Sequence, residues 1–353
     1  MNVLMLTDKL TTGGAEIYFC KLENELNHPS LQLFSAASEG ELFEKIKNKK
    51  NFLLLSKRNH LFNLLKLKRF IKRNNITIFH ANSLRMVLYT SILNFFKWKK
   101  SNVIYTKHNV TFLEKWTPVV FQLLLNHFVD SVITVSNYEK DNLIELGVNK
   151  NKITTIYNGV DLQQFLYKKK KKNNFFHIGI LARLSEEKNH EFFIQIAHKL
   201  RNYENYKFFI GGDGPELDKI MKRIHALELN DKITMLGQIH QPEEFVNNMD
   251  VLLLTSHREV FPMVVIEAMA VGTPMISINK GGIKEAVINN QTGCLIENHS
   301  VEEFCNKIIT IEMNDSLKSQ LILGAQQLVN KKFSLQNMIQ QTLNQYLKYE
   351  KQR

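Results

Sequence analysis

Short apolar runs that end at a polar or glycine-containing turn recur along the first half of the chain, and stretches with helical spacing follow several of them. Five runs predict strands, at 3–6, 53–55, 76–79, 103–106 and 131–135. The amphipathic stretches predict helices over 15–26, 61–73 and 137–146. Because strand and helix alternate, the pattern predicts a parallel sheet covered by crossover helices.

The same alternation restarts in the second half, after a tract of five lysines at 168–172. Further strands are predicted at 177–181, 206–210, 233–236, 251–255 and 275–278, with helices over 189–201, 216–227 and 263–270. Like charges repel one another, so the tract is expected to be a linker or an exposed loop.

These patterns predict an α/β protein with two doubly wound, Rossmann-like domains that face a cleft. We expect a first domain over 1–165, a basic linker over 166–174, a second domain over 175–335 and a C-terminal helix over 336–353 that could pack back on the first domain. Ligands of such sheets bind beyond the carboxyl ends of the strands.

Length and composition agree with two domains. The chain has 353 residues, of which 44% are hydrophobic and 23% charged, enough apolar material for two cores. No apolar run approaches the roughly 18 residues of a membrane span, and the first residues do not resemble a signal peptide. The three cysteines are scattered, which favours a reducing compartment without disulfides or a zinc site.

The formal charge of +12 is unevenly placed. The first 167 residues contain 22 Lys and Arg against 13 Asp and Glu, whereas the part after the lysine tract is close to neutral. A one-sided basic surface favours an anionic partner: nucleic acid, anionic lipid or an acidic substrate. A solvated surface in a lysine- and asparagine-rich chain is the alternative.

The most informative segment runs from Glu259 to Glu267. Pro262 suits the first position of a helix that starts at Met263, and the free amides of its first turn make an anion site. Phe261 and Val264 lie in the same segment. Its two carboxylates, Glu259 and Glu267, flank the helix start. The alternative is that Glu259 caps the helix and Glu267 is a surface residue.

Two cations follow the strand at 177–181. Arg183 can bind phosphate oxygens through two N–H groups, and Lys188 supplies a point charge. Together they would neutralise a diphosphate leaving group. Two ordinary surface cations are the alternative.

The first half offers weaker candidates. The pair Gly13 and Gly14 follows the first strand, and His80, His108, Asn109 and Ser136 follow later strands, where they could line the cleft. A single histidine is more often structural than functional.

The motifs appear in an order that resembles the retaining nucleotide-sugar glycosyltransferases of family 4. The matching segments are Gly13–Glu16, Tyr157–Asp161, Arg183 with Lys188, Glu259 with Glu267, and Gly281–Glu285. The resemblance covers nearly the whole chain. It implies the GT-B architecture, in which the second domain binds the sugar donor and the first binds the acceptor.

The resemblance also implies roles. Glu267 resembles the residue that holds the ribose hydroxyls, Glu259 the residue beside the transferred sugar, and Gly237 the place where the base meets backbone groups. His108 resembles the cleft histidine near the acceptor. Val260 departs from the family pattern, because a small residue commonly follows the first glutamate, and this departure leaves the donor sugar open.

No Asp-x-Asp motif occurs, so no metal or other cofactor is expected. Basic residues interleaved with apolar ones at 61–73 and 95–100 favour an anionic membrane surface as partner, although each could equally be an ordinary packed segment. No recognised motif supports nucleic-acid binding.

The sequence therefore predicts a metal-independent, retaining hexosyltransferase that uses a UDP- or GDP-sugar and a saccharide or lipid-linked acceptor. The expected setting is lipopolysaccharide or capsule synthesis, with a cytoplasmic protein peripheral on the inner face of the plasma membrane. A nucleotide-sugar epimerase of the same fold and a non-catalytic partner subunit are the alternatives.

Overall fold

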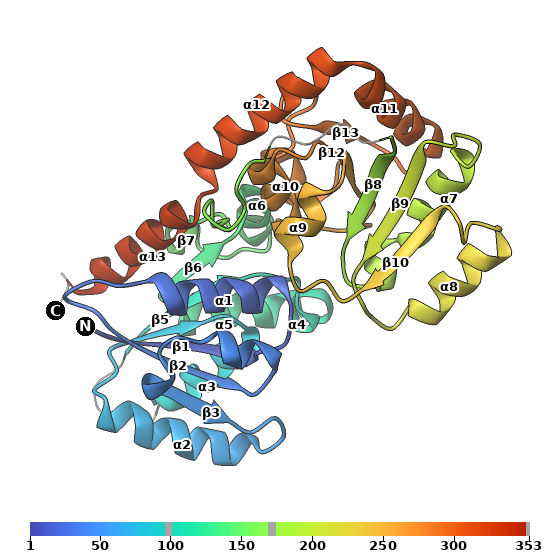
Figure 1. Ribbon diagram of the computed structural model, residues 1–353. Coiled ribbons are helices and arrows are strands. Elements are labelled where there is room, and N and C mark those ends of the chain that lie inside the picture. Colours follow the sequence, from blue (N-terminus) through green and yellow to red (C-terminus); the bar gives the residue numbers. More distant parts are fainter. Residues whose placement is uncertain (96–100, 169–173, 351–353) are drawn as a thin grey trace. The chain divides into compact units, whose positions relative to one another are not determined.

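The computed structural model describes residues 1–95, 101–168 and 174–350 and divides the chain into two compact units (Figure 1). The first unit contains Met1–Asn158 and the C-terminal segment from Leu335, and the second contains Gly159–Ser334. The chain thus enters the second unit at Gly159, not after residue 165. Of the expected linker at 166–174, residues 169–173 lie outside the described part.

The first unit is built on a seven-stranded parallel sheet with the order β3-β2-β1-β4-β5-β6-β7. Its strands are β1 (Asn2–Lys9), β2 (Gln32–Ser38), β3 (Phe52–Leu55), β4 (Ile78–Ala81), β5 (Asn102–Lys107), β6 (Ser131–Thr134) and β7 (Ile153–Thr155). The sequence pattern missed β2 and β7, and it placed β4 two residues too early, so that His80 lies inside the strand.

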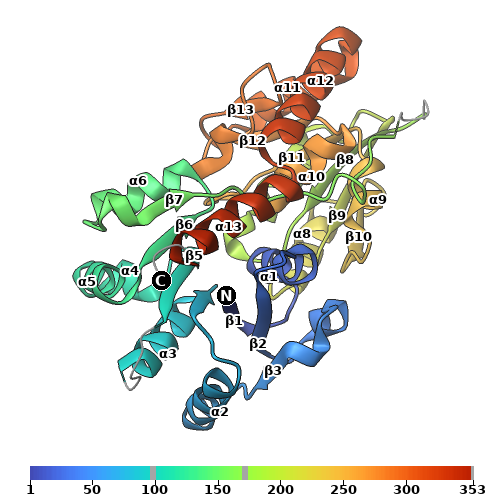
Figure 2. The ribbon, with the colours of Figure 1, turned by 90° about the vertical axis from the view of Figure 1, so that its left-hand side faces the viewer.

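Helices cover both faces of this sheet (Figures 1 and 2). Buried side chains of α1 (Gly14–Glu25) and α13 (Leu335–Glu350) pack on one face. The other face carries α2 (His60–Arg73), α3 (Leu84–Phe95), α5 (Pro118–Phe128) and α6 (Asn137–Glu145). Short helical segments complete the unit: α4 (Phe112–Trp116), η1 (Glu41–Lys45), η2 (Lys49–Asn51) and η3 (Lys150–Lys152).

The second unit is built on a six-stranded parallel sheet with the order β10-β9-β8-β11-β12-β13. Its strands are β8 (Phe176–Leu181), β9 (Tyr206–Gly211), β10 (Ile233–Gly237), β11 (Val251–Leu254), β12 (Met275–Ile278) and β13 (Cys294–Ile296). Its helices are η4 (Glu186–Lys188), α7 (His190–Lys199), α8 (Leu217–Ala226), α9 (Pro242–Asn247), α10 (Met263–Val271), η5 (Gly281–Glu285), α11 (Val301–Met313) and α12 (Asp315–Lys332).

The strand order confirms the expected fold class of two doubly wound α/β domains. In the first sheet β1 lies between β2 and β4, and in the second β8 lies between β9 and β11, so the chain direction across the sheet reverses at these strands. Ligands of such sheets bind at the carboxyl ends of the strands beside the reversal. Among the residues described, none of the helices has the length and apolar content that crossing a bilayer requires.

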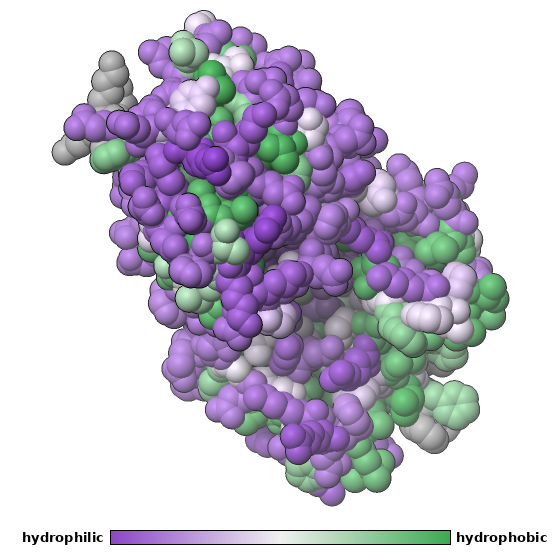
Figure 3. Space-filling model, turned by 90° about the vertical axis from the view of Figure 1, so that its right-hand side faces the viewer, coloured by the Kyte–Doolittle hydropathy of each residue, from purple (hydrophilic) through white to green (hydrophobic). Residues whose placement is uncertain are grey.

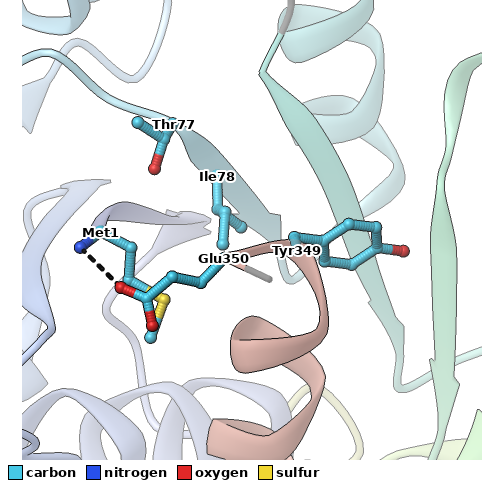
Figure 4. Close-up of a pocket in the computed structure, with 5 residues that line it drawn as sticks. All are labelled: Met1, Thr77, Ile78, Tyr349 and Glu350. Atoms are coloured by element: carbon cyan, nitrogen blue, oxygen red, sulfur yellow. Dashed lines mark ion pairs between the residues drawn. The ribbon is translucent and has the colours of Figure 1, made fainter. Parts of the chain in front are cut away.

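A small cavity of about 230 Å³ lies at the amino ends of the strands of the first sheet, on the side away from the carboxyl-end loops (Figure 4). Its lining residues are Met1, Thr77, Ile78, Tyr349 and Glu350. The terminal ammonium of Met1 lies 3.6 Å from a carboxylate oxygen of Glu350, which ties the end of α13 to the start of β1. Because Met1 and Thr77 precede their strands, this cavity lies away from the carboxyl-end loops.

Candidate functional site

In the second unit, loops from three adjacent strands meet around Glu259. The carboxylate is 7% exposed and accepts hydrogen bonds from Nζ of Lys188 at 2.6 Å and from Oγ of Ser256 at 2.7 Å. Lys188 lies in the loop after β8, and Ser256 in the loop after β11. The structure therefore brings together two predicted site residues and adds one, Ser256, that the sequence did not indicate.

Helix α10 starts directly after this carboxylate. Pro262 is the N-cap rather than the first helical residue, and no side chain caps the helix. The amides of Met263 and Val264 fall in the first turn, where a helix supplies no carbonyl partner. Both residues are partly exposed, so this end of the helix is open to an anion. Glu267 follows about one turn later and is buried.

Phe261, predicted as a donor-binding residue, has a buried side chain. Its ring centroid lies 5.2 Å from that of Phe333. Phe261 therefore packs inside the second unit, and its predicted contact with the donor is limited to what its backbone can supply.

The loop after β12 supports the loop before α10. The amide of Gly282 donates a hydrogen bond to the carbonyl of Val260 at 3.1 Å, and Gly281 has a φ of +64°. A positive φ favours glycine, because it has no Cβ to collide with the backbone. This contact fixes the backbone at Val260, the position that departs from the family pattern.

Arg183 lies at the same edge on a loop with many backbone hydrogen bonds. The amides of Ala182 and Leu184 donate to the carbonyls of Gly211 and Asp213 at 3.1 and 3.0 Å. The guanidinium itself is exposed and forms no ion pair with any described residue. The backbone is thus held while the charge stays available to a ligand.

Gly237 ends strand β10 with a φ of +65°, and its carbonyl accepts a hydrogen bond from the amide of Gly212 at 2.7 Å. A Cβ at Gly212 would lie 1.9 Å from the carbonyl oxygen of Ala182. Only glycine allows the loop after β9 to approach the loop that carries Arg183 so closely.

In the first unit, candidate residues lie at the carboxyl ends of β1, β4, β5 and β6. Gly13 is the N-cap of α1, with an extended backbone, and Gly14 is the first residue of that helix. Asn109 is exposed in the loop after β5. These loops come from neighbouring strands, so they gather at one edge of the sheet.

His108 is the best-placed histidine at this edge. Its ring is partly exposed, packs edge-on against Tyr18 with centroids 4.6 Å apart, and places Nε2 3.3 Å from Oδ1 of Asn82. Burial lowers the pKa of His108, and the ammonium of Lys107 lowers it further, to about 3. The imidazole is therefore neutral at physiological pH.

Beside His108 lies a buried ionic cluster that the sequence did not predict. Lys107 has no exposed surface; its ammonium lies 3.0 Å from a carboxylate oxygen of Glu114 and also pairs with Glu139. It donates a further hydrogen bond to the carbonyl of Asn109 at 3.2 Å. The cluster thus ties α4 and α6 to the loop that carries His108 and Asn109.

Two acceptor-side predictions are corrected by burial. His80 has no exposed surface, and both ring nitrogens are bonded, Nδ1 to the hydroxyl of Tyr346 at 2.5 Å and Nε2 to that of Thr106 at 2.6 Å. Ser136 is also fully buried and is the N-cap of α6, where its hydroxyl accepts from the amide of Glu139. Both side chains support the structure and do not face an open surface.

Two family models match adjacent stretches of the chain. The model described as Glycosyltransferase Family 4 covers residues 12–164, and the model described as Glycosyl transferases group 1 covers residues 163–328. The chain is a family 4 glycosyltransferase. Its two units are the two domains of the GT-B fold.

Individual relatives of this glycosyltransferase agree with the family. The capsular polysaccharide biosynthesis glycosyltransferase CapH of Staphylococcus aureus is 24% identical over 82% of this chain and 84% of CapH. N-acetyl-alpha-D-glucosaminyl L-malate synthase of Bacillus anthracis is 30% identical over 130 residues, which span 37% of this chain and 34% of that protein. Similarity to the synthase is therefore confined to about a third of its length.

Solved structures agree on the fold of this glycosyltransferase. The structure of HepE from Anabaena in complex with UDP-glucose has a TM-score of 0.86 and covers 99% of this chain and 100% of its own. Its sequence is 19% identical to this chain, so the likeness concerns the fold alone.

Proposed function

We propose that this glycosyltransferase moves a hexose from a nucleotide diphosphate to a saccharide or lipid-linked acceptor, with retention at the anomeric carbon and without a metal ion. The observation that carries the proposal is the buried Glu259 carboxylate, held by Lys188 and Ser256 directly ahead of the open end of α10. One short region thus presents a carboxylate, a cation and free amides to one small ligand.

The groups of the second unit match the parts of a nucleotide sugar. The first-turn amides of α10, Arg183 and Lys188 suit the diphosphate. An ammonium has three donors, so Lys188 can keep its bond to Glu259 and still bind a phosphate oxygen. Glu267 suits the ribose hydroxyls, and the backbone at Gly237 suits the base.

In the proposed reaction, the bond between the anomeric carbon and the β-phosphate oxygen breaks, and a bond from the same face to the acceptor oxygen forms. The leaving phosphate takes the proton of the acceptor hydroxyl. Glu259 stabilises the positive charge that develops on the sugar ring, while Arg183 and Lys188 stabilise the negative charge on the diphosphate. These cations and amides take the role that a metal clamp has in other transferases.

The relatives favour particular substrates. HepE has been solved with UDP-glucose, which supports a UDP-sugar ahead of a GDP-sugar as donor. CapH is named for capsular polysaccharide synthesis, which supports a surface polysaccharide or its lipid-linked precursor as product. Such an acceptor would place the enzyme in the cytoplasm, peripheral on the inner face of the plasma membrane.

The test is a thermal-shift and donor-hydrolysis panel of UDP- and GDP-sugars, with EDTA present, for the wild type and Arg183→Ala. A ligand that binds the native state raises its unfolding temperature. We expect one donor to stabilise the wild type and be hydrolysed slowly, with both effects strongly reduced in the variant. Arg201→Ala, another exposed arginine of the second unit, is the matched control and should behave as the wild type.

Other outcomes would favour a different function or mechanism. Isomerisation of the donor without an acceptor would indicate an epimerase. The absence of any shift with every nucleotide sugar would indicate a non-catalytic subunit. Hydrolysis that EDTA abolishes and Mg²⁺ restores would contradict metal independence.

A further inference from the structure

The outer surface of α4 and α5 is unusually apolar for a surface exposed to water. Phe112 and Trp116 on α4 are 75% and 71% exposed, and their rings stack with centroids 5.6 Å apart. On α5, Val119, Val120, Leu123 and Phe128 are each at least 45% exposed. We call these six side chains the α4–α5 ledge.

The composition of α5 explains the ledge. From Trp116 to Val129 the sequence contains no Asp, Glu, Lys or Arg. Phe121 and Leu125 face the core of the first unit and are fully buried, while Val120 and Leu123 point outward. A helix that is apolar on both faces is expected in a buried position or against lipid, not in water.

Neighbouring helices on the same face of the sheet extend the ledge. Leu88, Ile92 and Phe95 of α3 and Leu61, Phe62 and Leu65 of α2 are each at least 43% exposed. Twelve of the 24 large apolar side chains that are exposed in the described part of the chain therefore lie on these four helices. Green side chains gather at the lower right of Figure 3, where α3, α4 and α5 reach the surface. Contiguous apolar surface of this kind marks a binding site.

The charges around the ledge are of one sign. Between His60 and Phe128 the sequence has eleven Lys and Arg but only one acidic residue, Glu114, and that carboxylate is buried against Lys107. The next exposed carboxylates along the chain are Asp130, two residues after Phe128, and Asp141 and Glu145 on α6. An apolar surface with aromatic rings and a basic surround matches the acyl region and anionic headgroups of a bilayer.

We infer that the α4–α5 ledge inserts into the interface of an anionic lipid bilayer, with the basic face of α2 resting on the headgroups. This inference deepens the proposed function and rests on it for the nature of the acceptor. Helix α4 begins three residues after Asn109, and Glu114 on α4 binds Lys107, the neighbour of His108. Insertion of α4 therefore places the acceptor-side loop at the level of lipid headgroups, where a lipid-linked acceptor would present its sugar.

The first experiment measures co-sedimentation with vesicles of equal phosphatidylglycerol and phosphatidylcholine, without donor or acceptor. We expect Trp116→Gln/Leu123→Gln to reduce membrane partition by about tenfold or more, because two exposed apolar side chains no longer enter the bilayer. Met313→Gln/Leu323→Gln replaces two exposed apolar residues of the second unit and should bind as the wild type. Equal binding by both double variants would overturn the inference.

The second experiment follows Trp116 itself. The chain has two tryptophans, so Trp98→Phe leaves Trp116 as the only one. Its emission should shift to shorter wavelength with the anionic vesicles and be quenched by lipids brominated on the acyl chain. Binding of the protein without a change in Trp116 emission would show that another surface docks and would overturn the inference.

Two further measurements separate rival explanations. If the ledge instead covers a second copy of the chain, sedimentation velocity without vesicles will show a dimer that Trp116→Gln/Leu123→Gln dissolves, and vesicles will not bind. Donor hydrolysis by the same variant should match the wild type, because neither residue lies in the donor site. If the variant loses vesicle binding but keeps donor hydrolysis, the result supports membrane insertion of the ledge. If the wild type hydrolyses no donor, the result counts against the proposed function and not against membrane insertion.

Discussion

The ammonium of Lys188 lies 2.6 Å from Oε1 of Glu259, and this single bond joins the loop after β8 to the loop before α10. The two residues are 71 positions apart in the sequence. Strands β8 and β11 are neighbours at the point where the sheet reverses its winding, so the bond lies where ligands of this fold bind. The pair therefore compensates a buried charge and sets the position of two groups that we propose to bind the donor.

Loss of one member of this pair is expected to harm stability more than loss of both. Lys188→Met leaves the buried Glu259 carboxylate with the hydrogen bond from Ser256 but without its cation. We expect a loss of about 2 kcal/mol in unfolding free energy, below the usual figure for buried pairs because Lys188 is partly exposed. Lys188→Met/Glu259→Gln should recover most of that loss and remain inactive. Urea unfolding and donor hydrolysis measure the two effects.

Lys199→Met provides the matched control, since its pair with Glu302 is exposed on both sides. An exposed pair contributes about 0–1 kcal/mol, so this variant should unfold like the wild type. If the double variant were as unstable as Lys188→Met alone, the buried carboxylate would not be the source of the loss.

Asn82 is expected to set the protonation pattern of His108. Its amide nitrogen lies 3.4 and 3.5 Å from the carbonyls of Leu6 and His80, which turns the amide oxygen toward Nε2 of His108. Nε2 then carries the proton, and Nδ1 keeps its lone pair. Asn82→Asp places a carboxylate there and should raise the pKa of His108 from about 3 toward neutrality.

The measurement is kcat/KM for sugar transfer between pH 5 and 8. The wild type should show no inflection from His108 in this range, whereas Asn82→Asp should gain one and change activity as the imidazole becomes charged below it. His108→Ala in the Asn82→Asp background should remove the new inflection. An inflection that survives this change would assign it to another group.

Much of the fold could be predicted because most of the buried strands are short apolar runs with a polar stop. The missed strands lack that signal: β2 reads Gln-Leu-Phe-Ser-Ala-Ala-Ser, with small and polar residues, and β7 and β13 have three residues each. Their neighbours in the sheet, not their own side chains, determine that they pair.

The grouping of residues at the candidate donor site could be predicted further than that on the candidate acceptor side. Glu259, Pro262 and Glu267 lie on one local segment, so helix-start chemistry was enough to group them. His80 was misjudged because α13, from the far end of the chain, brings Tyr346 over it. The α4–α5 ledge was missed for a similar reason, since a continuous apolar run predicts burial and only the structure reveals which face stays open.

Gly212→Ala should damage donor binding through the backbone. The new Cβ would meet the carbonyl oxygen of Ala182 at 1.9 Å, and φ at this position is +137°, so the loop that carries Arg183 has to move. We expect a rise of about tenfold in donor Kd, equivalent to about 1.4 kcal/mol, together with a lower Tm. Isothermal titration with the donor measures the first effect.

Gly237→Ala is the comparison for stability. Its φ is +65°, but nothing lies within 4 Å of the new Cβ, so the cost should be the backbone strain of about 1 kcal/mol. Equal Tm losses in the two variants would mean that the contact with Ala182 is relieved without moving the loop.

The buried, neutral side chain of His80 should make the stability of the first unit sensitive to acid. Burial, and to a lesser extent His108, lowers the pKa of His80 to about 3, whereas the unfolded chain has the ordinary value of about 6.5. Below pH 6.5 the unfolded state therefore binds a proton that the folded state does not, so stability falls as the pH is lowered toward 3. At pH 4.5 this one group should cost about 2–3 kcal/mol relative to pH 7.

Replacing His80 by glutamine removes the titrating group and keeps a side chain that can hydrogen-bond to Thr106 or Tyr346. His80→Gln should be less stable than the wild type at pH 7, yet its loss of unfolding free energy between pH 7 and 4.5 should be smaller by about 2 kcal/mol. His240→Gln, at an exposed position, is the control and should keep the pH dependence of the wild type. Urea unfolding at the two pH values decides the matter: parallel losses in all three proteins would show that His80 is protonated in the folded state or retains its partners when charged.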